Sequence, residues 1–432
     1  MSEPIVGIIG IFILVLFFCT GIEIGFAMAV VGFLGFSYLV SVPAACNLLA
    51  KDLFDVFSSY GLTVIPLFIL MGQAASHSGI ASRLYGSANK FTGHVPGGLA
   101  IATVAGATVF GAISGSSIAT AATFASVAVP QMDRYGYDKR LSCGIVATVG
   151  ILDLLIPPSS MFIILGIITE QSIGKLFMAG IIPGLVLAVL FIAIIYSWCR
   201  INPSLGPKSE KYTWREKAAS LSEFVWPLLI FLVVIGGLMK GFFTPTEAGS
   251  IGAFAILILT LVKRSLGFKE FKIAIAESIR PTCMILMLVA GSTVLGHFIT
   301  MAQIPALAAA GIAKLPMPPW LIMTLILFVY LAGGSFVDDL AFMILATPIL
   351  YPAVIKLGYD PIWFCVMVTI TVGIGVIIPP VAACVFIVKN ITNVPFNVIY
   401  KGVYPFLVAF AACAALLFIF PGLATWLPAV LY

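Results

Sequence analysis

Two proline pairs stand in apolar stretches of this 432-residue chain, as Ile156-Pro157-Pro158 and Ile378-Pro379-Pro380. Proline donates no backbone hydrogen bond, and its ring clashes with the carbonyl group four residues upstream. The first pair therefore leaves the carbonyl oxygens of Asp153 and Leu154 without helical partners. Unpaired carbonyls in an apolar setting need another partner. A desolvated sodium ion, which takes several oxygen ligands, is a natural one.

Short runs of glycine and serine precede both proline pairs. Ser114-Gly115-Ser116-Ser117 comes before the first pair and Gly333-Gly334-Ser335 before the second. Each run lies between two apolar segments and predicts the tip of a re-entrant helical hairpin, whose oxygens could complete an ion shell. The candidate ligands are Ser114, Ser116, Asp153, Ile156 and Ser159 for a first sodium site, and Gly334, Gly375, Ile378 and Val381 for a second.

The second helix of each hairpin would begin at the tip, where its free amides and dipole favour an anionic group. The candidate substrate-binding residues are Ser114, Gly115, Ser116, Ser117, Ser335 and Asp338. An ionisable residue inside a membrane is functional by default, although Asp338 and Asp339 could equally cap the following helix. The Asp153 carboxylate could bind the ion or shuttle a proton. Alternatively, the proline pairs Pro157-Pro158 and Pro379-Pro380 are ordinary kinks.

The composition makes lipid the solvent for much of this chain. Hydrophobic residues make up 61% and charged residues only 9%, with a mean hydropathy of +1.17, whereas soluble domains carry about 25% charge. Apolar segments of about 20 residues span a bilayer, and the sequence supports about 10–11 of them. Basic loops at residues 200–223 and 263–280 flank an out-and-back helix pair, which places both in the cytoplasm. The absence of a C-x-x-C motif argues against zinc.

Matches within the chain recur at a constant offset of 222 residues. Pro157-Pro158 then aligns with Pro379-Pro380, and Gly136-Tyr137-Asp138 aligns with Gly358-Tyr359-Asp360. The loop count makes the two copies antiparallel. Inverted repeats with interrupted helices at matched positions are typical of secondary transporters that bind their substrate near the membrane midplane.

The sequence therefore predicts an all-α polytopic membrane protein with an inverted repeat. Its four parts are scaffold helices at 1–60; a first repeat at 61–200, with a hairpin at about 97–131 and a broken helix at about 138–170; a cytoplasmic loop, scaffold helix pair and interfacial arm at 201–279; and a second repeat at 280–432, with a hairpin at about 320–355 and a broken helix at about 360–391.

Several runs together resemble the large membrane subunit of tripartite ATP-independent periplasmic (TRAP) transporters, over essentially the whole chain. They are Gly111-Ala112-Ile113-Ser114-Gly115-Ser116-Ser117, Gly136-Tyr137-Asp138, Leu155-Ile156-Pro157-Pro158-Ser159, Ala179-Gly180-Ile181-Ile182-Pro183-Gly184, Phe243-Thr244-Pro245-Thr246-Glu247-Ala248 and Gly334-Ser335-Phe336-Val337-Asp338. The resemblance implies an elevator-type fold in a bacterial inner membrane. It also implies sodium-driven import of a small carboxylate or sulfonate, with a periplasmic binding protein and a separate, roughly four-helix membrane subunit as partners. No nucleic-acid partner is expected.

The chain departs from the family pattern where the ion would bind. The family usually has glycine where Asp153 stands, threonine where Ile378 stands, and an aspartate near Thr120. Backbone sodium sites survive these changes, whereas a hydroxyl ligand at position 378 does not. Proton coupling and an anion channel remain alternatives. An enzyme is not expected, because the three histidines are isolated and no nucleophile–base pair is evident.

Overall fold

A computed structural model of the chain describes residues 2–18, 20–314 and 316–431. Every regular element within these ranges is helical, which confirms the all-α prediction. The first half contains α1 (Glu3–Phe18), α2 (Ile24–Leu39), α3 (Val42–Phe57), the 3-10 helix η1 (Tyr60–Thr63), α4 (Val64–His77), α5 (Ile80–Thr92), α6 (Gly98–Ser114), α7 (Ser117–Arg134), α8 (Lys139–Val149), α9 (Leu152–Leu155), α10 (Ser160–Ile168) and α11 (Ile173–Ile201). The second half contains α12 (Trp214–Ser220), α13 (Ser222–Met239), α14 (Pro245–Val262), α15 (Phe268–Met301), α16 (Ile304–Ala313), α17 (Pro319–Phe336), α18 (Asp339–Lys356), α19 (Pro361–Gly375), α20 (Ala383–Thr392), α21 (Phe396–Ile419) and α22 (Gly422–Leu431).

Fewer helices can cross a bilayer than the sequence suggests. Seven described helices are long and apolar enough, or up to nine if each of two bent pairs forms one span. Six other apolar helices have only 10–17 residues. At a rise of 1.5 Å per residue these helices fall short of a hydrocarbon core of about 30 Å. The multi-pass membrane prediction is confirmed, and the expected 10–11 spans are too many.

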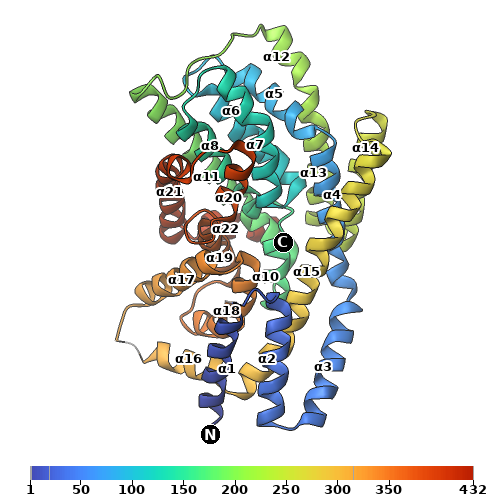
Figure 1. Cartoon of the computed structure of the whole chain (residues 1–432), viewed down its shortest axis with the longest axis vertical. Helices are drawn as coiled ribbons and strands as arrows, with labels where there is room; N and C mark the ends of the chain where they lie inside the picture. The colour runs from blue at the N-terminus through green and yellow to red at the C-terminus, as the bar shows by residue number, and fades with distance from the viewer. Residues whose placement is uncertain (1, 19, 315, 432) are drawn as a thin grey trace.

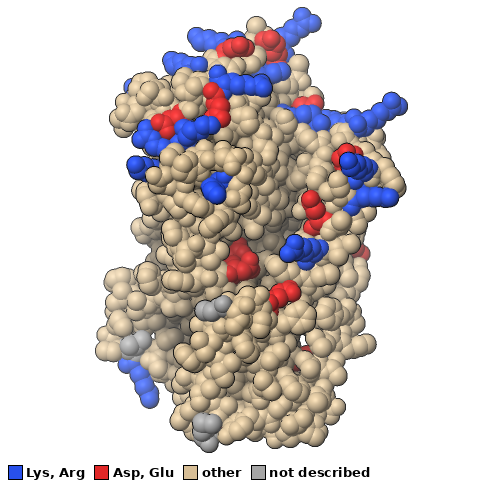
Figure 2. Space-filling model, viewed as in Figure 1, with Lys and Arg blue, Asp and Glu red and all other residues tan. Residues whose placement is uncertain are grey.

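The basic side chains gather at one end of the molecule. Figure 2 shows Lys and Arg concentrated over the upper part, where α5 and α12 lie in Figure 1, while the lower half of that face is almost free of them. The positive-inside rule assigns the upper end to the cytoplasm. The long axis of the molecule therefore leads from a basic cytoplasmic end towards an apolar, membrane-embedded region.

Two helix pairs occupy the positions of the expected hairpins. In the first pair, α6 ends at Ser114 and is capped by Gly115, whose φ of +62° suits glycine. The Ser116 side chain caps α7 by accepting a hydrogen bond from the Ala119 amide. In the second pair, α17 and α18 have 18 residues each and pass the length test for a span. They are therefore longer than the too-short segments that the sequence suggested.

The second tip lies later than expected. α17 continues through Gly333-Gly334-Ser335 to Phe336, and the turn falls at Val337 and Asp338. Each glycine costs a helix about 1 kcal/mol, which packing overrides here. The Ser335 hydroxyl stays within the helix by donating to the Leu331 carbonyl at 2.8 Å. Because aspartate is a strong N-cap, Asp338 sets the start of α18.

Breaks interrupt the helices that carry the proline pairs. The first helix is divided into α8, α9 and α10 and bends by 42° before Ser160, and the second is divided into α19 and α20. The helix starts keep the offset of 222 residues: α7 and α18 start at Ser117 and Asp339, and α8 and α19 at Lys139 and Pro361. The antiparallel orientation of the two copies remains a prediction.

The long helix α15 packs against α2 at close range. It runs unbroken for 34 residues, so the expected arm and the boundary at residue 279 lie within one helix that tolerates Pro281. A Cβ atom built on Gly25 would lie 2.7 Å from the Met287 carbonyl carbon, and one on Gly32 would lie 2.7 Å from the Leu295 amide nitrogen. Small residues let membrane helices approach this closely.

Gly291→Ala is expected to destabilise the contact between α2 and α15. A Cβ atom at position 291 would overlap the Gly25 carbonyl group, and overpacking of this kind costs about 1–3 kcal/mol. Gly296→Ala is the matched control on the same helix, because nothing lies within 4 Å of its Cβ position. Thermal unfolding in detergent should show a lower midpoint for the first variant alone. Equal midpoints would contradict the proposed packing.

Candidate functional site

A cavity of about 140 Å³ lies where the two hairpin tips meet. Ser114, Gly115, Ser116 and Ser117 of the first tip line it, and so does Asp338 of the second. The remaining lining comes mainly from α4, α10 and α15, including Gln73, Ser160 and Met284, and Asp339 at the start of α18 also lines the cavity. Five of the six predicted substrate-binding residues therefore share one cavity, although Asp338 lies more than 200 positions from the other four in sequence.

No lysine, arginine or histidine is among the described residues that line this cavity. Its charged side chains are Asp338 and Asp339, and its neutral polar groups are serine hydroxyls and the Gln73 amide. The start of α7 at Ser117 and the start of α18 at Asp339 also lie there. Helix N-termini attract anions, whereas carboxylates attract cations. The cavity can therefore accommodate ligands of both signs together.

The capping interpretation of Asp338 is confirmed. Its Oδ1 atom accepts a hydrogen bond from the Ala341 amide at 3.1 Å, and Oδ1 of Asp339 accepts one from the Leu340 amide at 2.9 Å. Asp338 also lines the cavity, so capping and ligand contact are compatible. Each carboxylate has a second oxygen that could face a bound ion.

The first tip contacts the first helix break directly. The Ser160 hydroxyl donates to the Gly115 carbonyl at 3.5 Å, and a Cβ atom on Gly115 would lie 2.6 Å from the Pro158 carbonyl oxygen. The Ser159 hydroxyl donates to the Leu154 carbonyl at 2.7 Å. One of the two carbonyls that the proline pair frees is thus satisfied within the chain, and it does not depend on an ion.

Asp153 lies in a separate buried position behind the first tip. It is fully buried, its Oδ2 atom accepts a short hydrogen bond from the Thr120 hydroxyl, and the Thr120 oxygen lies 3.4 Å from that of Ser114. Oδ1 of Asp153 has no hydrogen-bond partner among the described residues and faces Gly111. A buried carboxylate oxygen without a partner is costly unless a proton or a cation satisfies it. This arrangement fits a cation site.

Two departures from the TRAP pattern prove to be neighbours. The departures noted in the sequence lie at Asp153 and near Thr120, and the side chains of Thr120 and Asp153 touch. The spacing of 33 residues could not reveal this contact, but the paired departures were a signal.

The second tip packs against the second break through backbone atoms. A Cβ atom on Gly375 would lie 2.6 Å from the Gly334 carbonyl carbon, and the Val381 amide donates to the Ser335 carbonyl at 3.1 Å. Four predicted site residues therefore lie together, namely Gly334, Ser335, Gly375 and Val381. The Ile378 amide instead donates to the Ile374 carbonyl, four residues upstream, just beyond the end of α19.

None of these residues lines the cavity between the tips, and Ser335 is the one predicted substrate-binding residue outside it. Likewise, Asp153, Ile156 and Ser159 lie behind the cavity surface, whereas Pro158 lines it. The predicted residues thus form a shared cavity with two further groups beside it, one near each helix break. The group at the first break is buried, whereas Val381 at the second is 39% exposed.

The expectation that the histidines are isolated is wrong for two of them. The Nε2 atom of His77 lies 2.7 Å from a Glu277 carboxylate oxygen, and that of His297 lies 3.4 Å from Asp52. Both pairs join α15 to a neighbouring helix. Neither histidine lines the cavity. Sequence reasoning missed these pairs, because their members lie 200 or more residues apart.

Comparison with solved structures shows which known folds this chain resembles. The chain aligns with the YdaH transporter of Alcanivorax borkumensis at a TM-score of 0.62 and 13% identity, covering 88% of this chain and 89% of that one. It aligns with Neisseria gonorrhoeae MtrF, described as belonging to a class of antimetabolite efflux pumps, at a TM-score of 0.55 and 15% identity, covering 86% and 84%. At such low identity the likeness shows the fold alone.

Sequence comparison defines the family. Residues 11–423 match the tripartite ATP-independent periplasmic transporter, DctM component. The C4-dicarboxylate TRAP transporter large permease protein DctM of Pseudomonas aeruginosa is 34% identical, covering 91% of this chain and 90% of that protein. The isethionate TRAP transporter permease protein DctMQ of Oleidesulfovibrio alaskensis is 32% identical, covering 99% and 66%. This chain belongs to the large membrane subunits of TRAP transporters, which are permeases and not enzymes.

Proposed function

We propose that this subunit imports a small organic anion, a carboxylate or a sulfonate, driven by a sodium gradient. The cavity between the two hairpin tips is the observation that carries the proposal. It offers two helix N-termini for an anion but no basic side chain among the described lining residues, while two aspartates would repel that anion. Bound cations would remove the repulsion, so that anion and cation bind favourably only together.

The sodium ions would bind beside the cavity, near the two breaks. For the first site, the unpartnered oxygen of Asp153 and the hydroxyl of Ser114 are the groups that best fit a cation. For the second, the tightly packed backbone around Gly334 and Gly375 supplies carbonyl oxygens. Hard cations prefer oxygen ligands of this kind. A proton on Asp153 is the alternative occupant of the first site.

Relatives suggest the chemical class of the substrate. Those similar to this chain are named for C4-dicarboxylate, isethionate and sialic acid, which are all anions. We propose that a periplasmic binding protein delivers the anion and that a small membrane subunit, present as a separate chain, completes the permease. In this proposal the two tips and breaks move as a unit against α2 and α15, carrying the cavity across the membrane as an elevator.

Uptake measured in vesicles tests the coupling. The large subunit would be reconstituted with its small subunit and binding protein, and uptake of the anion would be followed with and without an inward sodium gradient. Accumulation is expected only with the gradient, because the aspartates need a cation before the anion can bind. A potassium gradient of equal size is the control.

Two outcomes would contradict the proposal. Equal accumulation without sodium but with a pH gradient would favour proton coupling instead. Non-saturable flux in both directions would favour a channel.

A further inference from the structure

A second hollow, of about 780 Å³, opens at the basic end of the molecule between α5, α7 and α12. Three of its lining residues are basic: Arg83, Lys90 and Arg134. Several others carry hydroxyl or amide groups: Ser87, Asn89, Ser126, Gln131 and Tyr212. Glu223 is the acidic residue in its described lining. We call this hollow the basic pocket, and it shares no lining residue with the cavity between the hairpin tips.

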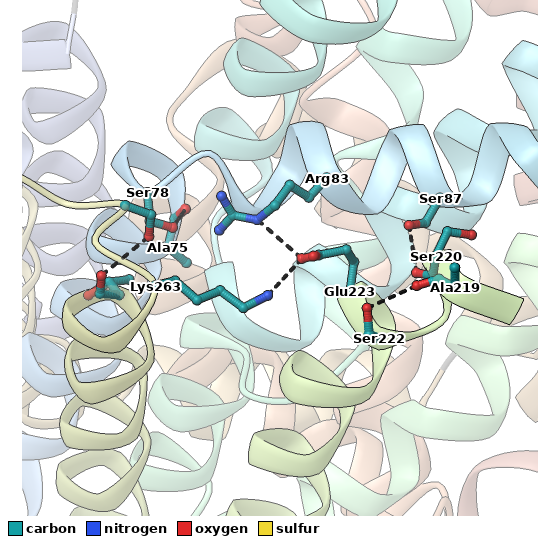
Figure 3. A network of polar contacts seen from close by, with 11 residues as sticks. Ala75, Ser78, Arg83, Ser87, Ala219, Ser220, Ser222, Glu223 and Lys263 are labelled. Carbon is teal, nitrogen blue, oxygen red and sulfur yellow. Dashed lines mark hydrogen bonds and ion pairs between the residues drawn. The ribbon is translucent and has the colours of Figure 1, made fainter. Parts of the chain in front are cut away.

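Glu223 is already engaged by two cations. The Nε atom of Arg83 lies 3.3 Å from its carboxylate, and the Nζ atom of Lys263 lies 2.8 Å from the same oxygen, as Figure 3 shows. Neither Lys90 nor Arg134 forms an ion pair with a described residue. The basic pocket therefore carries excess positive charge.

A second carboxylate, that of Glu216, interacts electrostatically with Lys90. This carboxylate already accepts hydrogen bonds from Thr213. The Thr213 amide and hydroxyl donate to the Glu216 carboxylate at 2.8 and 2.7 Å. Glu216 thus serves the start of α12 and does not cancel the charge of the pocket.

Two buried donors in this region lack partners. The Nη2 atom of Arg83 is inaccessible to solvent and has no hydrogen bond within the described chain, although its Nε atom is paired. The Tyr85 hydroxyl is also buried without a partner, and that residue is only 3% exposed. A buried donor without a partner is costly and calls for an occupant such as water or an ion. Positive charge together with free donors points to an anion.

The surroundings place the basic pocket at the surface of the bilayer. Trp214, which begins α12, is 81% exposed, and Trp226 of α13 is 47% exposed. The Nζ atom of Lys217 lies 5.2 Å from the centre of the Trp214 ring. Tryptophan concentrates at the headgroup level of membranes. Ser87 fixes α5 to α12 at this level by donating to the Ser220 carbonyl at 2.8 Å (Figure 3).

We propose that the basic pocket binds the phosphate group of an anionic phospholipid in the cytoplasmic leaflet. Basic pockets between helices on the cytoplasmic side suit such headgroups, because the leaflet supplies phosphate esters at high local concentration. Arg83, Lys90 and Arg134 surround the phosphate, and the neighbouring hydroxyl and amide groups accept or donate further hydrogen bonds. The exposed apolar surface beside Trp226 accommodates the acyl chains.

Native mass spectrometry of the full chain tests this proposal. The protein would be released from vesicles that contain phosphatidylglycerol and phosphatidylcholine in equal amounts, and the retained lipids would be counted. We expect retained phosphatidylglycerol in the wild type and a loss of about tenfold in the double variant Lys90→Gln, Arg134→Gln. The matched control, Arg200→Gln with Lys208→Gln, removes two basic charges outside the pocket. It should retain the lipid. Thermal unfolding verifies that both variants are folded.

Four outcomes would overturn the proposal. Equal loss in both double variants would mean a general charge effect, and equal retention of the two lipids would mean no headgroup recognition. Displacement of the lipid by the transported anion would assign the pocket to the transport route. Inorganic phosphate serves as the other probe: a lipid site predicts weak binding of phosphate alone, whereas tight phosphate binding without lipid retention would indicate a soluble ligand. The readout does not depend on transport activity.

Discussion

Asp153→Asn should lower sodium-driven uptake by at least about tenfold, because it removes the one buried carboxylate behind the first hairpin tip. The carboxylate bonds to Thr120 through one oxygen and leaves the other free for a cation. Asparagine keeps the volume and loses the charge. Uptake at graded sodium concentrations, measured in reconstituted vesicles, should show a higher half-saturating concentration. The effect on folding should be small, since a neutral amide is easier to bury.

Variants of neighbouring threonines provide the controls for this prediction. Thr120→Val removes the hydroxyl that contacts Asp153 and should shift the sodium dependence in the same direction. Thr108→Val in α6 removes a hydroxyl that bonds only to the Val104 carbonyl, and it should leave uptake unchanged. If Asp153 carries a proton instead, Asp153→Asn should abolish the pH dependence and preserve the sodium dependence. An unchanged response to both would reduce Asp153 to a backbone ligand.

Gly375→Ala should abolish transport while the protein still inserts and folds. A Cβ atom there would lie 2.6 Å from the Gly334 carbonyl carbon and 2.8 Å from its oxygen, so the break would be pushed away from the second hairpin. Backbone atoms cannot move aside as a flexible side chain can. Such overpacking costs about 1–3 kcal/mol and displaces the carbonyl groups proposed to bind sodium.

Gly373→Ala is the matched control on the same helix. Its Cβ atom would meet side-chain methyl groups only, Cγ2 of Ile151 at 2.8 Å and Cδ1 of Leu154 at 3.2 Å, and no backbone atom of a neighbouring segment. We expect substantial uptake and near-normal sodium dependence from this variant. If both glycine variants behaved alike in uptake and thermal unfolding, close contact between Gly375 and the second tip would not be important for function.

Most of the fold could be predicted from sequence, because proline and apolar length act locally. The proline pairs end α9 and α19 near the expected positions, and the glycine and serine run at residues 114–117 marks the first tip. The second tip was misplaced because glycine only weakens a helix, whereas the capping Asp338 determines where α18 starts. Tertiary packing keeps the glycines at 333 and 334 helical and leaves the turn at Asp338. A local sequence pattern does not contain this packing information.

The candidate site could be predicted only in part. The duplicated tips indicated which residues would meet, and Ser116 and Asp338 do share a cavity. The contribution of α4 through Gln73 was missed, because one polar residue in an apolar helix has no distinctive spacing. The contact between Thr120 and Asp153 was missed for a related reason: it joins two helices whose relative position depends on the whole bundle.

The absence of basic residues from the described lining of the cavity has an electrical consequence. With Asp338 and Asp339 ionised and no cation bound, the cavity is negative, and moving one elementary charge across a membrane involves about 2.3 kcal/mol per 100 mV. In the proposed elevator motion, an interior-negative potential then drives the empty cavity outward. The sodium ions proposed beside the cavity would offset part of this negative charge, together with that of the bound anion, before the inward movement. Membrane voltage would therefore assist the return of the empty carrier, which resets the protein for the next cycle.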